Sequence, residues 1–235
     1  LSQPRATMAT AAVGGKLLFA GGSSNGIYSK VVDIYDTQTG KWSTSSLSKA
    51  QVNSSVTVAG NKIFISGGVV EGAMYSETVE VYDAGTNAWS VINLPGNKIR
   101  TTTCANERYV FITTGSEAYG FANRLHIFDT QNGQLKAVNF PFPITEFAMG
   151  VIGNKVVIAG GRKTDNSSLD EGLSDVLVYD AVTGKMDTPA FSLPEKIRMA
   201  SAIGGDNKLF IGGGVTTSPA PLLKNQRMVS VFQLR

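Results

Sequence analysis

Short apolar runs that end in glycine recur along the chain. Five runs follow one pattern, at residues 16–22, 62–68, 109–115, 155–161 and 208–214. Their last glycines stand at positions 22, 68, 115, 161 and 214, so successive steps are 46, 47, 46 and 53 residues. A sequence period in this range is typical of propellers and solenoids. The chain is therefore predicted to be one repeat domain, in which most prominent residues serve the scaffold.

The second repeat shows which elements the pattern predicts. Residues 52–58 are small and β-branched, residues 63–66 are apolar, and residues 78–82 alternate with a period of two. A fourth short run covers residues 88–91, and glycine, asparagine and aspartate separate the runs. This spacing predicts an all-β meander of four short strands per repeat, called a, b, c and d in chain order.

An aromatic residue followed by aspartate closes strand c, and a large residue follows on strand d. The aspartate can bond backbone amides of the c–d turn, and the two large side chains can pack between adjacent sheets. The positions are Tyr35-Asp36 with Trp42, Tyr82-Asp83 with Trp89, Phe128-Asp129 with Leu135, Tyr179-Asp180 with Met186, and Phe232 in the last repeat.

The glycines after strand b look like a phosphate-binding loop, but no helix follows and no Gly-Lys-Ser/Thr completes a P-loop. A bulge or a close approach of two backbones is the expected reason for them. These glycines are Gly21, Gly22, Gly67, Gly68, Gly115, Gly160, Gly161, Gly213 and Gly214.

The combination of these signatures resembles kelch repeats. Glycines follow strand b, Tyr-Asp ends strand c, tryptophan follows seven residues later, and Pro4-Arg5 precedes the first strand a. The resemblance covers essentially the whole chain and implies a kelch-type β-propeller, with five blades of mostly four antiparallel strands. The single domain 1–235 would contain repeats at approximately 1–46, 47–93, 94–139, 140–192 and 193–235.

The fifth repeat stops after strand c, so the last blade is expected to lack its outer strand. The alternative is that the chain is part of a six- or seven-bladed propeller. An uncovered strand edge is a template for pairing, which makes self-association through the incomplete blade a hypothesis.

Composition excludes several classes of function. The chain has 235 residues, a net charge of +3 and a single cysteine, Cys104, so it can form neither an internal disulfide nor a cysteine-based zinc site. Cys104 is expected to be a small buried filler on a strand a.

No apolar run is long enough to span a membrane, and no block of consecutive Lys/Arg supports nucleic-acid binding. The surface, rich in Gly, Ser, Thr and Asn and poor in Lys and Glu, is typical of a secreted or cell-surface bacterial protein. Because the chain begins at Leu1 without methionine or a signal peptide, we expect a processed or trimmed product.

Function is expected where the repeats differ. The b–c loops vary most and share one face with the d–a connections, and variable loops on a rigid scaffold usually carry binding residues. Three loops contain a tyrosine, and the connections add basic side chains, which in kelch adaptors form a pocket for acidic peptides. The candidate binding residues are Arg5, Tyr28, Tyr75, Lys98, Arg100, Tyr119 and Arg198. The expected partner is a protein or peptide, acidic by this comparison, or a glycan.

Enzyme functions have less support. Copper-binding relatives of kelch propellers use two histidines, whereas His126 is the only histidine here, and its alternation with Leu125 and Ile127 predicts a surface or edge position. An iron motif of related plant proteins would need histidine where Tyr179 stands. We therefore expect neither a metal nor a cofactor. A sialic-acid-mutarotase-like activity, which needs no metal, is the alternative function, and a structural role through the open blade edge is the third.

Overall fold

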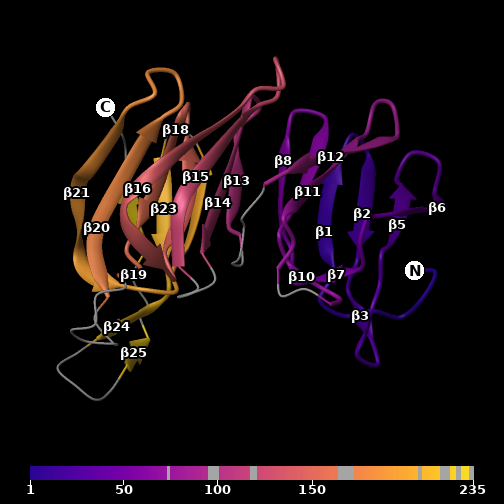
Figure 1. Ribbon diagram of the computed structural model, residues 1–235, viewed down its shortest axis with the longest axis horizontal. Helices are drawn as coiled ribbons and strands as arrows, with labels where there is room; N and C mark the ends of the chain where they lie inside the picture. The colour runs from indigo at the N-terminus through magenta and orange to yellow at the C-terminus, as the bar shows by residue number, and fades with distance from the viewer. Residues whose placement is uncertain are drawn as a thin grey trace.

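The computed structural model describes residues 1–72, 75–94, 101–116, 121–163, 172–205, 208–217, 223–225 and 229–232. These residues form β-strands and connecting turns, without any helix (Figure 1). Among them, no helix is therefore long and apolar enough to cross a membrane. The predicted all-β class is confirmed.

Five antiparallel sheets follow one another along the chain, and we number them as blades 1 to 5. Blade 1 contains β1 (Ala9–Val13), β2 (Lys16–Ala20), β5 (Val31–Asp36) and β6 (Lys41–Ser46). Blade 2 contains β8 (Ser55–Ala59), β9 (Lys62–Ser66), β11 (Thr78–Asp83) and β12 (Ala88–Asn93). Blade 3 contains β13 (Thr103–Ala105), β14 (Tyr109–Ser116), β15 (Phe121–Asp129) and β16 (Leu135–Thr145). Blade 4 contains β17 (Ala148–Ile152), β18 (Lys155–Ala159), β20 (Leu173–Asp180) and β21 (Met186–Ile197).

Blade 5 is shorter in the described part of the chain. Its three strands are β22 (Ser201–Gly205), β23 (Lys208–Gly212) and β26 (Val229–Phe232), where β26 holds the position of strand c. The fourth strand that completes blades 1 to 4 is not among these residues.

The first strands of the blades stand around a common centre. Strand β1 lies beside β8, β8 beside β13, β13 beside β17, and β17 beside β22. Figure 1 shows the inner strands β8 and β13 towards the middle of the molecule, with the outer strands β6 and β21 at its two margins. This radial arrangement of sheets is that of a β-propeller.

Blades 2 to 4 each pack one face, the front face, on the blade before and the other, the back face, on the blade after. Between blades 1 and 2, Leu18 and Ile34 of the back face meet Ile63, Ile65 and Tyr82 of the front face. The three later junctions contain equivalent buried clusters. Burial of each such side chain contributes about 1.5–3 kcal/mol, so the junctions hold the blades together.

The aromatic signatures of blades 2 to 4 occupy these junctions, and the aspartate signatures stand at the turns beside them. The ring centroids of Tyr82 and its cross-strand neighbour Trp89 are 5.1 Å apart, and Tyr35 and Trp42 form the same pair at 5.0 Å. The Asp83 carboxylate accepts hydrogen bonds from the N–H groups two and three residues further on, which fixes the c–d turn. Asp36 and Asp180 accept bonds from the corresponding amides.

The paired glycines stand between the connections of two neighbouring blades. The Gly161 N–H donates to the Ile197 carbonyl of the next connection at 2.8 Å, and Gly22 makes the same bond to Gln51. A Cβ added to Gly161 would lie 2.6 Å from the Thr145 carbonyl oxygen of its own connection. Real side chains do not approach so closely, so only glycine fits this site.

Candidate binding surface

One end of the propeller carries the b–c loops and the d–a connections together. The residue after the paired glycines forms a β-bridge to its own connection, as in Ala6 with Ser23 and Arg198 with Val215. Short ribbons extend these bridges, namely β3 (Ser23–Ser24) with β4 (Ile27–Tyr28), β7 (Gln51–Val52) with β10 (Val69–Val70), β19 (Arg162–Lys163) with the end of β16, and β24 (Val215–Thr217) with β25 (Leu223–Asn225). They lie at the lower end of the view in Figure 1, which we call the loop face.

Arg5 is a buried structural residue rather than part of an exposed basic rim. Its guanidinium is inaccessible to solvent and forms an ion pair with Asp33. It also donates hydrogen bonds to two carbonyl groups of the same blade, those of Gly21, which follows strand b, and of Val31, the first residue of strand c. These polar contacts of the guanidinium all lie inside blade 1, and the place of Arg5 among the expected binding residues is corrected to a scaffold role.

Arg198 is also mostly buried, and the structure brings it to an acidic neighbour. Arg198 Nη1 lies 3.2 Å from Glu146 Oε2, and Arg162 Nη2 lies 3.6 Å from Glu146 Oε1. The backbone joins the same two connections, since the Met199 N–H donates to the Glu146 carbonyl at 2.7 Å. Of this cluster, Arg162 and Glu146 are the more accessible members.

Tyr28 lines a groove of the loop face. It is half-buried on β4, and the groove beside it has a volume of about 410 Å³. The lining residues are Gln3, Ser24, Asn25, Ile27, Tyr28, Ser29, Lys30 and Val31. Gln3 Nε2 donates to Ser29 Oγ at 2.7 Å, which fastens the N-terminal segment to one wall.

Ile27 also lines this groove. It was not among the candidate binding residues, all of which were tyrosines or basic residues. It is 72% exposed at the start of β4, directly after the turn of the β3–β4 hairpin. The sequence signal that could have identified Ile27 is an aliphatic residue in an otherwise polar loop, between Gly26 and Tyr28. A single exposed aliphatic side chain is common on protein surfaces, so Ile27 is a candidate contact residue because it lines the groove together with Tyr28.

The other candidate residues are less informative about a site. Tyr75 is half-buried and precedes Ser76, whose N–H donates to the Gly68 carbonyl at 2.9 Å. Lys98, Arg100 and Tyr119 lie outside the described residues.

His126 is buried, which corrects the expected surface position. Its Nε2 lies 3.0 Å from Thr114 Oγ1 on the neighbouring strand. Burial, together with the positive charge of Arg124, lowers the pKa of the imidazole.

Within the described ranges, no cluster of three or more His, Cys, Asp or Glu side chains could hold a metal ion. The thiol of Cys104 packs against the cluster between blades 3 and 4, and burial raises its pKa, which suits a filler and not a nucleophile.

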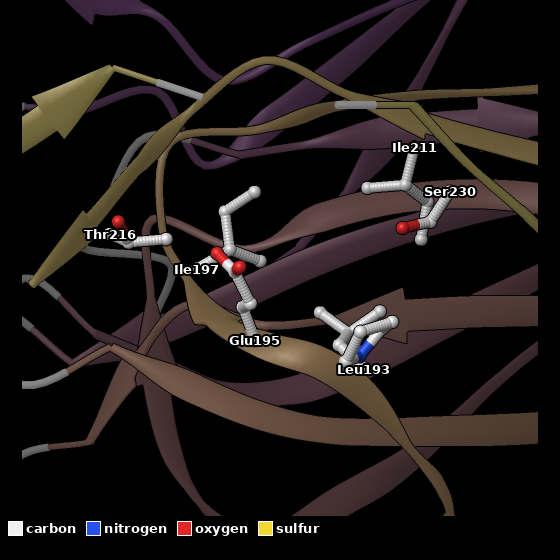
Figure 2. Close-up of a pocket in the computed structure, with 7 residues that line it drawn as sticks. Leu193, Glu195, Ile197, Ile211, Thr216 and Ser230 are labelled. Atoms are coloured by element: carbon white, nitrogen blue, oxygen red, sulfur yellow. The ribbon is translucent and has the colours of Figure 1, made fainter. Parts of the chain in front are cut away.

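A small cavity lies where blade 4 meets the hairpin of blade 5. Figure 2 shows Glu195 and Ile197 of β21 facing Thr216 across it, with Ile211 and Ser230 further along. Its volume is about 20 Å³, which is room for about one water molecule. A sugar does not fit there.

Comparisons with known proteins agree on the fold. Residues 53–233 match the family described as the KLHDC2/KLHL20/DRC7 Kelch-repeats domain, and residues 4–46 match the Kelch motif. A solved structure described as "Structure of YjhT" is similar, with a TM-score of 0.69 and 16% sequence identity, over 99% of this chain and 82% of that chain. At this identity the likeness shows the fold alone. Comparison with curated proteins gave no match. Because the kelch profile covers well over half of the sequence, the chain belongs to the kelch-repeat family.

Proposed function

We propose that this kelch propeller is a non-catalytic binding module that holds a protein or peptide partner on its loop face. The observation that carries the proposal is the groove beside the β3–β4 hairpin, where Ile27 stands exposed next to Tyr28. Both residues belong to a variable loop supported by a rigid blade, which is the usual place for recognition.

The chemistry of the groove indicates the kind of partner. Burial of Ile27 by a partner would contribute about 1.5–3 kcal/mol, since its side chain is now largely in water. Tyr28 offers a ring face and a hydroxyl group, a combination that recurs at interfaces. Lys30 is exposed on the same wall and favours an acidic segment through electrostatic complementarity. An extended peptide with an apolar residue beside a carboxylate fits these three side chains.

The test selects ligands without assuming their identity. A random peptide library is panned on the full chain, and selected peptides are measured by calorimetry against the parent chain and variants. Ile27→Asp and Tyr28→Ala should each weaken binding by about tenfold or more, as loss of an interface anchor does. Val182→Asp is the matched control, because Val182 is 65% exposed in a c–d turn at the opposite end.

Equal affinities for the parent chain and the folded Ile27→Asp variant would remove the hairpin from the proposed site. A glycan array on the same protein tests the glycan alternative, which also predicts a loss of signal with Ile27→Asp. A mutarotase-like activity gains no support from the cavity beside Glu195, because its volume of about 20 Å³ is too small.

A further inference from the structure

The backbone of Tyr28 faces the outer edge of the b–c hairpin in blade 1. Ser29, the next residue, directs its N–H inwards and donates to the Gly22 carbonyl at 2.9 Å. Lys30 directs its carbonyl the opposite way, where it accepts a hydrogen bond from the Leu47 N–H at 2.8 Å. Successive residues of an extended strand direct their backbone groups to opposite sides, so the N–H and carbonyl of Tyr28 point outwards, as the Lys30 carbonyl does.

The pairing of β4 with β3 gives the same direction. Ser23 lies opposite Tyr28, and both backbone groups of Ser23 bond to Ala6, with N···O distances of 2.8 and 2.9 Å. Ser23 and Tyr28 are therefore a non-hydrogen-bonded pair, whose backbone groups point away from each other. Within the described part of the chain, no group forms a hydrogen bond with the N–H or the carbonyl of Tyr28.

The outer strand of blade 1 leaves this edge open. Strand β6 pairs with β5, and Leu47 adds the last bond of this pairing, to Lys30. Ser48 then turns towards blade 2, where its N–H donates to the Glu80 carboxylate at 3.1 Å and its hydroxyl bonds to the same oxygen. A strand placed beside Tyr28 would therefore continue the line of β6.

The open edge is held in shape on both sides of Tyr28. Asn25 and Gly26 form a two-residue turn with φ angles of +49° and +79°, which is the type I′ geometry that suits a tight hairpin. On the other side, Ser29 Oγ accepts a hydrogen bond from Gln3 Nε2 at 2.7 Å. Because the edge is already ordered, a partner loses little affinity to the ordering of this segment.

The charge around the edge is positive. Lys30 is exposed, and Lys49 is exposed in the connection that follows β6. Neither lysine forms an ion pair with a described residue. Residues 23–31 and 47–51 contain no aspartate or glutamate. Electrostatic complementarity therefore favours an acidic partner.

We propose that an extended acidic peptide binds to this edge as an added antiparallel strand on β4. This inference rests on the proposed function and adds the mode of binding. The peptide residue opposite Tyr28 donates its N–H to the Tyr28 carbonyl and accepts a hydrogen bond from the Tyr28 N–H. In strand addition, such main-chain bonds supply affinity and the alternating side chains supply specificity.

The register determines the order of side chains in the peptide. The side chain opposite Tyr28 lies on the same face as Tyr28 and Lys30, and Lys30 is its diagonal neighbour, within reach of a long side chain. This peptide residue is therefore a glutamate. The next residue towards the peptide C-terminus lies opposite Ile27 on the other face and is apolar. The expected motif is glutamate followed directly by an apolar residue.

N-methylation of single peptide residues tests the main-chain bonds. The probe is the tightest-binding peptide with this motif from the library panned on the full chain. N-methylation of its glutamate should weaken binding by about tenfold or more, because the Tyr28 carbonyl loses its donor. N-methylation of the following apolar residue should have a far smaller effect, since that N–H points away from β4. Calorimetry measures both affinities.

The chain itself gives a second measurement. Hydrogen exchange of the Tyr28 amide, followed by NMR, should slow severalfold when the unmethylated peptide is added. The Ser29 amide is the internal control, because its bond to Gly22 is present without the peptide. Lys30→Gln should weaken binding severalfold, and Lys41→Gln is the matched control, since Lys41 is an exposed lysine at the opposite end of blade 1.

The outcomes distinguish this inference from the proposed function. Weaker binding to Ile27→Asp, with equal effects of the two N-methylations and unchanged exchange of the Tyr28 amide, would overturn strand addition and leave the binding surface in place. Selected peptides whose affinity does not depend on Ile27 would overturn both. Selected peptides without an acidic residue that protect the Tyr28 amide would overturn the acidic class of partner.

Discussion

The guanidinium of Arg5 and the carboxylate of Asp33 form an ion pair from which solvent is excluded. The Ser2 N–H donates a further hydrogen bond to Asp33 Oδ1 at 2.9 Å. Burial on its own would raise the pKa of Asp33, but the hydrogen bonds from Ser2 and Arg5 outweigh it and hold the pKa below its ordinary value. The pair ties the N-terminal segment to strand β5 of blade 1.

Removal of Arg5 alone should therefore be costly. Arg5→Met leaves the Asp33 carboxylate buried without its partner, and such a change destabilises a protein by about 3–5 kcal/mol. The double variant Arg5→Met with Asp33→Leu should recover most of this loss, because no buried charge remains. Urea unfolding of the two variants and the parent chain measures the difference. A loss of less than about 1 kcal/mol for Arg5→Met would contradict the assigned role.

The sequence predicts the scaffold well and the partners of single side chains poorly. Glycine pairs and Tyr-Asp turns are local signals, so they indicate strands and turns without knowledge of the whole fold. The role of Arg5 depends on Asp33, which is 28 residues away and comes close only when the blade forms. Arginine before strand a therefore looked like a surface residue.

His126 shows a second limit of local patterns. Alternation with Leu125 and Ile127 correctly places it on the other face of its strand, and in a two-layer sandwich that face is in water. In a propeller both faces of a blade are covered by neighbouring blades, so all three residues are buried. Ile27 was missed for the opposite reason, since a single aliphatic residue in a polar loop gives no periodic signal.

The buried His126 should make stability depend on pH. Its pKa is lowered in the folded chain by burial, whereas the unfolded chain has the ordinary value of about 6.5. As the pH falls, His126 is therefore protonated in the unfolded state before it is protonated in the folded state. The folded state loses stability from a pH of about 6.5 down to the lowered pKa of His126 in the folded chain, and no further loss from this group follows below that pKa. Urea midpoints at a series of pH values from neutral to moderately acidic should fall for the parent chain.

His126→Gln is the control for this effect. Glutamine can keep a hydrogen bond to Thr114 but takes up no proton, so the slope of stability against pH should flatten whatever the absolute stability of the variant. Asp36, Asp83 and Asp129 have lowered pKa values and contribute little in this window. An unchanged slope would show that His126 is not the titrating group.

Gly160 and Gly213 hold equivalent positions and should respond differently to alanine. Their φ angles are +66° and +71°, so a left-handed conformation costs each variant about 1–2 kcal/mol. Gly160→Ala must also displace the Ile197 carbonyl, and such overpacking costs about a further 1–3 kcal/mol. Gly213→Ala carries no such penalty. Thermal or urea unfolding should therefore rank Gly160→Ala as the less stable variant, and equal losses would contradict the close approach of the two backbones.

Thr7 is a β-branched residue held at a φ of +56°, and Asn53, Glu146 and Met199 share this conformation at the equivalent connections. Threonine is the least suited of the four to the left-handed region, so Thr7→Gly should stabilise the folded chain by about 1 kcal/mol even after the larger entropy of the unfolded glycine. The hydrogen bond from the Asn53 N–H to the Thr7 carbonyl, with an N···O distance of 3.2 Å, does not involve the Thr7 side chain and should persist in Thr7→Gly. Thr10→Gly is the matched control, since Thr10 is also an exposed threonine but lies in the extended strand β1, where glycine should cost about 0.5–1 kcal/mol. Urea midpoints that fall for both variants would show that the connection at Thr7 stores no strain.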